Sequence, residues 1–110
     1  MAKLVTIERL RDGWDGPGSV AVKSVAVRGY REFIDRFPRV PADLEPMPTP
    51  TGGLRMEWDR GEYSYVAEIE GNGGMFLCMI GPTESDDFEV ELDWVDTDRL
   101  VDFYRGRSIG

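Results

Sequence analysis

Carboxylates are the reactive side chains that this sequence supplies in quantity. Its 110 residues include 21 Asp and Glu, no histidine and one cysteine, Cys78. Without histidine the chain lacks the commonest general base, the commonest zinc ligand and every nucleophile that a histidine activates. One cysteine allows no intramolecular disulfide, and its place in the apolar run 75–80 predicts a buried, inert thiol. Any catalysis would have to use carboxylates alone or a bound metal ion.

The spacing of the carboxylates supports neither kind of catalysis. Asp86-Asp87-x-Glu89 lacks the ligand spacing of a calcium-binding loop. A catalytic pair of carboxylates needs surroundings that shift one pKa, and the sequence marks no acidic residue with an apolar pocket. We therefore expect a protein that is not an enzyme, with no catalytic residue, no metal site and no cofactor.

The acidic residues are concentrated in one part of the chain. Residues 62–102 hold twelve Asp and Glu and one basic residue, Arg99, whereas residues 1–61 are close to neutral. This charge disfavours direct binding to nucleic acid, since contact with phosphates needs positive side chains. A basic protein surface is the partner that the charge favours. The alternative is that the charge serves only to keep the protein soluble.

A row of carboxylates follows from the alternating pattern at 88–94. Glu89, Glu91 and Asp93 alternate with apolar residues, so in a strand they project from one side at intervals of roughly 6.6–7 Å. Such a row can engage a basic site on a partner, including a nucleic-acid-binding site, because it can mimic a row of phosphates. The candidate partner-binding residues are Asp86, Asp87, Glu89, Glu91, Asp93 and, as an aromatic anchor if it lies outside the core, Trp94.

Two amphipathic segments precede the acidic region. Apolar residues at three-residue spacing predict a helix over 3–12. A wider apolar stripe predicts a second helix over 24–37, which Pro38 ends. The five prolines of 38–50 then predict an extended connector. The stripe of the second helix consists of Ala26, Val27, Tyr30, Phe33, Ile34 and Phe37.

From residue 53 onward the apolar period changes from about 3.6 to about 2, which predicts strands. Gly71-Asn72-Gly73-Gly74 is a strong hairpin signal. The run 75–80 is apolar throughout, which is typical of a central strand covered on both faces. The predicted strands are 54–59, 62–70, 75–80 and 88–94, and a short helix is predicted over 97–105. The chain is therefore predicted to be one α+β domain, residues 1–110, with two N-terminal helices, a four-stranded antiparallel meander and a short C-terminal helix.

A turn between the first two helices allows two interpretations. The segment Gly13-Trp14-Asp15-Gly16-Pro17-Gly18-Ser19 contains three glycines and a proline, so it is not helical. In one interpretation the Trp14–Gly18 turn binds a ligand. In the other it is structural, with Asp15 accepting hydrogen bonds from nearby backbone N–H groups and Trp14 packing under the helix. We favour the structural interpretation.

Two short motifs occur in a recognisable order. They are Leu10…Gly13-Trp14-Asp15-Gly16-x-Gly18 and Gly52-Gly53-Leu54-x-Met56-Glu57-Trp58, separated by an amphipathic helix and the proline-rich segment. In this order they resemble a group of small uncharacterised proteins of bacteria and their phages, which share a WDG-x-G turn and a GG-x-x-x-E-W strand. The resemblance covers residues 4–70 and gives the acidic segment 82–110 no counterpart. It implies mobile-element biology, in which many small proteins are antitoxins, immunity proteins or inhibitors of host systems, and it implies no catalytic role for any residue.

The location and the role of the protein follow as expectations. No apolar stretch approaches the roughly 20 residues that span a bilayer, and the first residues lack the apolar core of a signal peptide. We therefore expect a cytoplasmic protein that does not bind membranes. The leading hypothesis is a non-enzymatic acidic protein-binding protein, such as an inhibitor, antitoxin or immunity-type protein of bacterial or phage origin, that engages a basic site on a partner. The alternative is a small-molecule or peptide-binding domain that uses the Trp14–Gly18 turn and the proline-rich connector as the rim of a pocket.

Overall fold

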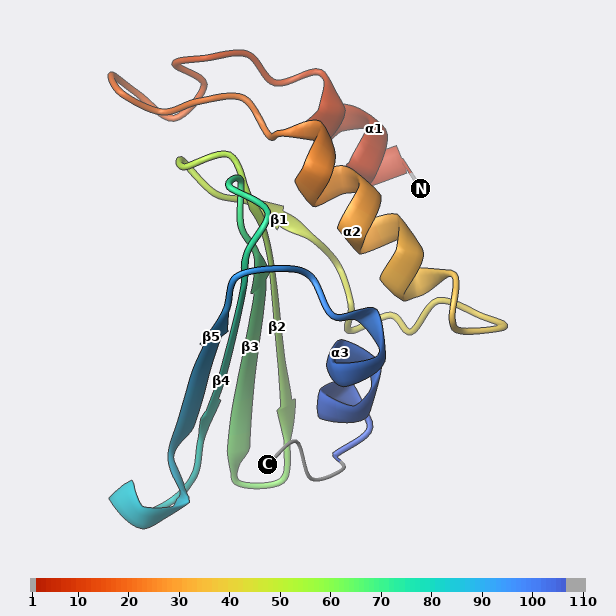
Figure 1. Cartoon of the computed structure of the whole chain (residues 1–110), viewed down its shortest axis with the longest axis vertical. Coiled ribbons are helices and arrows are strands. Elements are labelled where there is room, and N and C mark those ends of the chain that lie inside the picture. The colour runs from red at the N-terminus through yellow and green to blue at the C-terminus, as the bar shows by residue number, and fades with distance from the viewer. Residues whose placement is uncertain (1, 107–110) are drawn as a thin grey trace.

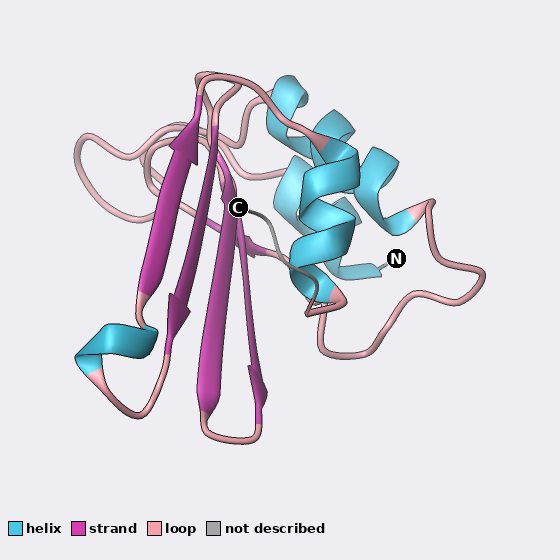
Figure 2. Cartoon of the chain, turned by 60° about the horizontal axis from the view of Figure 1, so that its bottom comes forward, coloured by secondary structure: helices cyan, strands magenta, loops and turns pink. Residues whose placement is uncertain are grey.

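Segments with alternating apolar and polar side chains pair into one antiparallel sheet. The computed structural model describes residues 2–106. Its elements in that range are α1 (Ala2–Glu8), α2 (Ser24–Ile34), β1 (Met47–Pro48), β2 (Leu54–Arg60), β3 (Tyr63–Ile69), β4 (Met75–Ile80), the 3-10 turn η1 (Glu84–Asp86), β5 (Phe88–Leu92) and α3 (Thr97–Tyr104). The strands lie in the order β1-β2-β3-β4-β5, so each strand pairs with its neighbours in sequence. The three helices all lie on the same side of the sheet (Figure 1 and Figure 2).

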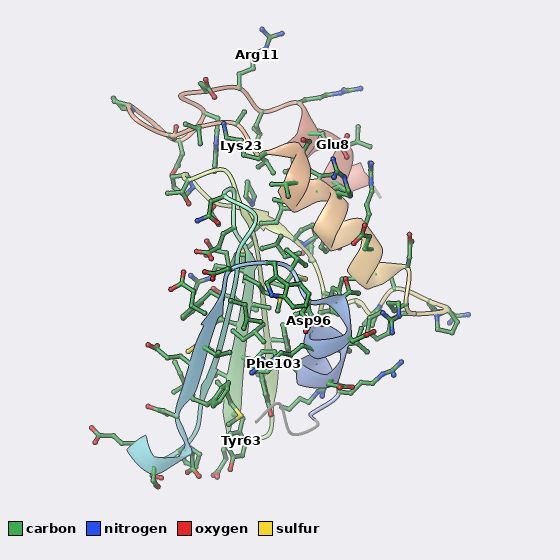
Figure 3. The ribbon with its side chains drawn as sticks, viewed as in Figure 1. Glu8, Arg11, Lys23, Tyr63, Asp96 and Phe103 are labelled. Atoms are coloured by element: carbon green, nitrogen blue, oxygen red, sulfur yellow. The ribbon has the colours of Figure 1, made fainter. Side chains whose placement is uncertain are left out.

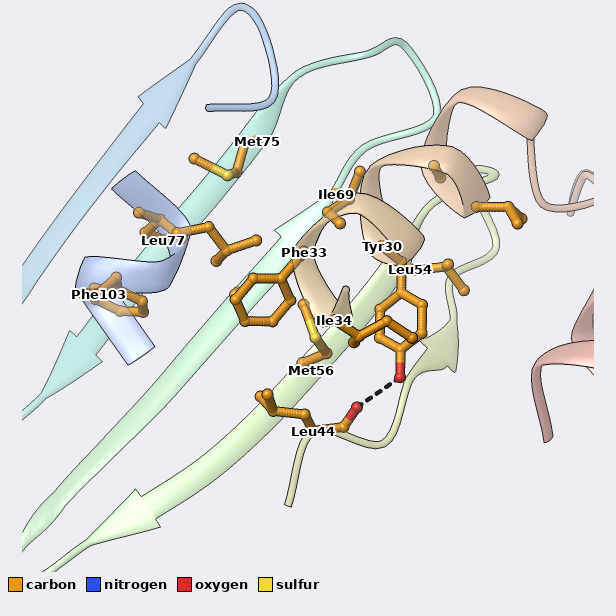
Figure 4. Packing of buried hydrophobic residues seen from close by; sticks show 14 of the residues in the cluster. Tyr30, Phe33, Ile34, Leu44, Leu54, Met56, Ile69, Met75, Leu77 and Phe103 are labelled. Atoms are coloured by element: carbon orange, nitrogen blue, oxygen red, sulfur yellow. Dashed lines mark hydrogen bonds between the residues drawn. The ribbon is translucent and has the colours of Figure 1, made fainter. Parts of the chain in front are cut away.

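The inner face of the sheet, which packs against the helices, holds the apolar members of the alternating pattern. The register sets Met56, Ala67 and Leu77 side by side on β2, β3 and β4, and all three are fully buried. Tyr30 of α2 enters the same layer, and its hydroxyl donates a hydrogen bond of 2.9 Å to the carbonyl of Leu44 (Figure 4). Burial raises the pKa of Tyr30 to about 12, so its hydroxyl stays protonated. Each large apolar side chain buried here contributes about 1.5–3 kcal/mol to folding.

Helix α3 is placed by contacts at both of its ends. At its start, Asp96 caps the helix by accepting the backbone N–H of Arg99 at 3.1 Å. Phe103 points from the helix toward the sheet (Figure 3). At its end, the hydroxyl of Tyr104 donates to Asp43 at 2.7 Å, which ties the helix to the proline-rich segment. The helix ends at Tyr104, one residue before the predicted end.

The α+β class and the antiparallel order of the strands are confirmed, but the sheet has five strands instead of the predicted four. The additional strand, β1, lies inside the proline-rich segment that was predicted to be only a connector. Met47 pairs there with Arg55, and Pro48 pairs with Leu54. Proline is confined to edge strands in sheets, and β1 is an edge strand of two residues. The proline-rich composition therefore conceals this strand from a search for alternating patterns.

Three elements end at least two residues before their predicted ends. Helix α1 ends at Glu8 rather than at residue 12, α2 ends at Ile34 rather than at 37, and β5 ends at Leu92 rather than at 94. After both helices, successive N–H groups bond to the carbonyl three residues back, which is the tighter turn that closes many helices. The apolar spacing continues through such a turn, so a prediction from periodicity overestimates the length of the helix.

Candidate functional site

The sheet has an outer face, opposite the helices, that no helix of residues 2–106 covers (Figure 1 and Figure 2). The alternation that buries one set of side chains directs the other set to this face. Figure 3 shows side chains projecting from it, away from the helices, along the whole length of the strands. The outer face consists of Arg55, Glu57, Asp59, Ser64, Val66, Glu68, Phe76, Cys78, Ile80, Glu89 and Glu91.

Strand β4 gives the outer face an apolar centre. Phe76 and Cys78 are half-buried there, and Ile80 is 50 % exposed. Val66 of β3 lies directly opposite Cys78. The expectation that the run 75–80 is covered on both faces is wrong, because the helices cover only one of them. Apolar surface left uncovered in this way is characteristic of interaction sites.

Cys78 belongs to the outer face, so its thiol is half-buried and not enclosed in the core as predicted. Burial is the main cause that raises the pKa of Cys78. The charges of Glu89 and Asp87 raise it further, and the charge of Arg55 opposes them. A thiol with a raised pKa is protonated at neutral pH and is a weak nucleophile.

Two carboxylates of β5 border the apolar centre. Glu91 lies directly opposite Phe76, and Glu89 lies directly opposite Cys78; both carboxylates are exposed. No ion pair among residues 2–106 neutralises either of them. The ion pairs Arg31–Glu8 and Arg36–Asp98 lie away from the outer face, and Arg55 on the outer face pairs with Glu57 of its own strand.

A further carboxylate, that of Glu70, lies against Glu91. A Cβ atom at Gly74 would come within 2.7 Å of the Oε1 atom of Glu70, so the Glu70 side chain crosses the backbone at this glycine. Burial raises the pKa of Glu70, and the neighbouring charges of Glu91 and Glu68 raise it further. Three carboxylates therefore crowd the hairpin end of the outer face.

The other predicted partner-binding residues lie at the two ends of β5. Before the strand, Asp87 accepts a backbone N–H of its loop at 3.0 Å and Asp86 accepts a hydroxyl of the same loop at 2.8 Å, so both shape the loop. After the strand, Asp93 is exposed. Trp94 is 61 % exposed and lies outside the core, which leaves it accessible as an anchor. The structure thus places Glu89 and Glu91 together on the outer face. The other four predicted residues lie at the two ends of β5.

Residues at or beside this surface that the sequence did not point to include Val66, Glu68, Glu70, Phe76 and Ile80. One signal for them was present. The glycine-rich hairpin at 71–74 fixes how the strands on either side pair, and alternation then sets Glu68 and Phe76 opposite each other. The interpretation of 75–80 as fully covered removed Phe76 and Ile80 from consideration.

A shallow hollow of about 310 Å³ opens at the start of β5. Its apolar walls and its carboxylates suit the aliphatic stem and the charged end of a lysine or arginine side chain. A larger hollow, about 480 Å³, runs along α2, but its lining includes the ion pair of Glu8 and Arg31, so it offers both charges. The hollow at β5 is lined by Cys78, Met79, Ile80, Asp87, Phe88 and Glu89.

The Trp14–Gly18 turn is closed by its own hydrogen bonds. The Nε1 of Trp14 donates to a backbone carbonyl six residues further along at 2.8 Å, and the N–H of Asp15 donates to the Ser19 hydroxyl at 3.0 Å. The carboxylate that accepts a nearby backbone N–H is that of Asp12, at 2.9 Å, rather than that of Asp15. The proline-rich connector leaves α2 at the end far from this turn (Figure 1) and meets the turn's flank only at its own end, where the N–H of Val20 donates to the carbonyl of Pro50 at 2.9 Å.

The carboxylates do not assemble into a metal site in the part of the chain that the structure describes. Among residues 2–106, no three or more Asp, Glu, Cys or His side chains are placed to hold a metal ion together. Within the same range, no helix has the length and apolar character needed to cross a membrane.

Comparisons of the chain with protein-family models, with curated proteins and with solved structures found no significant match. The geometry of the outer face is therefore the basis for assigning a role. Its charges can hold a cationic group by ion pairing, and its apolar centre can bury a nonpolar group beside it.

Proposed function

We propose that this protein is a non-enzymatic binding protein that engages a basic surface on another protein through its outer face and β5. The observation that carries the proposal is the position of Glu89 and Glu91. They point out of an uncovered sheet face beside Phe76 and Cys78, and no ion pair in the described residues neutralises them. The resemblance to small bacterial and phage proteins supports the role of an inhibitor, antitoxin or immunity-type protein.

The combination of an apolar centre and a charged border matches how protein interfaces are built. Their centres are apolar and poor in charge, and their rims are polar and reached by solvent. Here Phe76, Ile80 and Val66 would supply the centre, and the carboxylates of β5 would supply one border. The carboxylates would attract a positively charged partner over several ångströms before contact, which speeds association more than it tightens the final complex.

Solubility alone accounts for the acidic charge but not for the apolar side chains beside it. A sheet face that only meets water usually alternates apolar inside with polar outside. On this face Ile80 is 50 % exposed and Phe76 is half-buried, so apolar surface remains that folding does not use. We therefore favour binding over solubility as the role of the outer face.

The alternative of a ligand site at the Trp14–Gly18 turn has weaker support. The polar groups of Trp14 and of the Asp15 backbone already donate within the turn or to its flanking residues. Such a turn has fewer unsatisfied donors to offer a small molecule or a peptide. The proline-rich connector also lies away from the turn along most of the connector's length. We do not propose this second function.

Capture of partners by the immobilised protein tests the proposal. The wild type is compared with the double variant E89K/E91K and with a matched control, E32K/D35K, in which two exposed acidic residues of the α2 side are reversed. Bacterial lysate is passed over each protein at about 50 mM and about 500 mM salt, and the retained proteins are identified by mass spectrometry. We expect a basic protein that the wild type and the control retain at low salt, that the E89K/E91K variant loses, and that high salt releases.

The E32K/D35K control carries the same change in net charge as E89K/E91K. It therefore separates an effect of the two β5 positions from an effect of the overall charge of the protein. Equal retention by all three proteins would show that Glu89 and Glu91 do not contact the partner. Equal loss in both double variants would show that only the overall charge matters. Either result would end the proposal for this surface.

A further inference from the structure

The two edges of the sheet differ in what they offer a neighbouring strand. An edge strand presents backbone N–H and C=O groups that have no partner in the sheet. At one edge, β1 pairs with only Leu54 and Arg55 of β2, and Pro48 supplies no N–H. The rest of that edge, residues 56–60 of β2, has no further strand beside it among residues 2–106, and its outward Glu57 already forms an ion pair with Arg55. At the other edge, β5 has five residues and no proline, so its backbone donors and acceptors are continuous. Of the two edges, β5 is the one on which no outward carboxylate forms an ion pair in the described residues, so it is the edge that suits a basic strand.

The side chains of β5 divide by face in a way that an added strand would extend. Phe88, Val90 and Leu92 continue the inner apolar layer, and all three are only half-buried because the sheet stops there. Glu89 and Glu91 continue the outer face. A strand beside β5 would therefore meet apolar side chains on one face and carboxylates on the other.

A second copy of this chain does not fit that edge. In an antiparallel pair centred on Val90, Glu89 of each copy would lie opposite Glu91 of the other. A shift by two residues brings Asp87 or Asp93 into the row, because every second position from 87 to 93 is acidic. A shift by one moves the apolar side chains to the wrong face. Since like charges directly opposite each other destabilise a pair of strands, β5 repels itself in every register.

The complementary strand has basic residues at alternate positions with apolar residues between them. Its basic side chains would lie beside the carboxylates of β5, and its apolar side chains would cover the half-buried inner layer. The hollow of about 310 Å³ at the start of β5 is lined by apolar side chains and by the carboxylates of Asp87 and Glu89, which fits the end of one lysine or arginine side chain.

We infer that the partner binds by strand addition: an extended segment with alternating basic and apolar residues pairs with the free edge of β5, its basic side chains beside Glu89 and Glu91. The inference rests on the proposed function, because it specifies how a basic partner is held. Backbone hydrogen bonds supply affinity in this mode of recognition, and the alternating side chains supply specificity.

Two peptides of identical composition test the inference with the full-length protein. The first, Lys-Val-Lys-Val-Lys-Val-Lys, alternates; the second, Lys-Lys-Lys-Lys-Val-Val-Val, carries the same charge in a block. Fluorescence anisotropy gives the Kd of each peptide for the wild type, for E89K/E91K and for E32K/D35K. We expect the alternating peptide to bind the wild type and the control at least about tenfold more tightly than the block peptide, and to lose this advantage with E89K/E91K.

Backbone methylation of the alternating peptide distinguishes strand addition from attraction between charges. One peptide is N-methylated at its odd residues and another at its even residues, so each has lost the N–H groups along one edge. Only one edge of an added strand faces β5. We therefore expect one methylated peptide to bind like the parent and the other to bind at least about tenfold more weakly, with amide hydrogen exchange slowed across residues 88–92 by the peptides that bind.

Several outcomes would overturn strand addition. They are equal affinities for the alternating and block peptides, equal effects of the two methylation patterns, and absence of binding by the alternating peptide. If any of these occurs while E89K/E91K still loses the partner captured from lysate, the outer face remains the docking surface and only the mode of binding is wrong. If the peptides behave as expected but the captured partner ignores E89K/E91K, the edge accepts basic strands and the proposed function is wrong for that partner.

Discussion

Neighbouring residues of β4 meet two different surroundings. Leu77 is fully buried under the helices, whereas Cys78 faces the uncovered side and Ile80 is 50 % exposed. All three side chains are apolar, so the difference lies in what covers them and not in their chemistry. The inner face uses its apolar area to stabilise the fold, and the outer face keeps its apolar area free for contact with another molecule.

Shortening one apolar side chain on each face of β4 tests this difference most directly. We expect Leu77→Ala to lower the free energy of unfolding by about 2–5 kcal/mol, because it leaves a cavity in a closed layer. We expect Ile80→Ala to change it by less than about 0.5 kcal/mol, since half of that side chain already contacts water. Urea unfolding of both variants measures the difference. Similar losses would mean that the outer face is as important for folding as the inner one.

It could not be predicted from the sequence that the helices leave one face of β4 uncovered. Six consecutive apolar residues carry no alternation, so the strand looks covered on both faces. Whether a face is covered depends on where the helices pack, and here α2 and α3 lie on one side because their apolar stripes match one layer only. The strands on either side, in which charged and apolar residues alternate, had their faces predicted correctly.

A mixture of the wild type with the E89K/E91K variant tests whether the edge of β5 repels a copy of itself but accepts a basic strand. Reversal of both carboxylates in E89K/E91K gives β5 the alternating basic and apolar pattern proposed for the partner. We expect this variant to associate with the wild type at about 0.1 mM, and we expect neither protein to associate with itself through β5. Sedimentation velocity measures the mass of each sample and of the mixture.

The E32K/D35K variant is the control for that mixture, because it has the same net charge with an unchanged β5. A mixture of this control with the wild type should show no added association. If it associates as strongly as the E89K/E91K mixture does, the attraction comes from net charge alone, and the edge has no special role.

The apolar centre of the outer face should matter more for binding than for folding. Phe76→Ser removes a half-buried ring beside Glu91 and Glu68, so we expect a loss of about 1 kcal/mol in stability. We expect the retention of the captured partner to fall about tenfold, because aromatic side chains at the centre of an interface carry a large share of its energy. Unfolding and retention are measured on the same preparation. Unchanged retention by a folded variant would remove Phe76 from the interface.

The row of Glu89 and Glu91 could be predicted from the sequence, and the cluster that they join could not. Alternation within one segment fixes the face of each residue relative to its neighbours. The approach of Glu70 to Glu91 depends instead on the pairing of three strands and on the absence of a side chain at Gly74. Contacts of this kind arise between segments, so a pattern within one segment does not reveal them.

The smallest effect that we expect is on stability, and it concerns whether the carboxylates crowded on the outer face destabilise the fold. Burial and the nearby charges of Glu91 and Glu68 raise the pKa of Glu70 above its ordinary value of 4.5. The folded protein therefore holds the Glu70 proton more tightly than the unfolded chain does. The stabilisation from this proton is complete below the ordinary pKa and is lost as the pH rises through the raised pKa. Above the raised pKa the ionised carboxylate remains among like charges.

Glu70→Gln removes that charge and keeps the shape of the side chain. We expect the variant to exceed the wild type in stability by less than about 1 kcal/mol at about pH 7, and to match it at about pH 4, where Glu70 of the wild type is protonated. Urea unfolding at the two pH values measures this, with Glu62→Gln, at the opposite end of β3, as an exposed control. A variant less stable than the wild type at neutral pH would show that Glu70 makes a favourable contact as an anion, and the outer face would then not be under electrostatic strain.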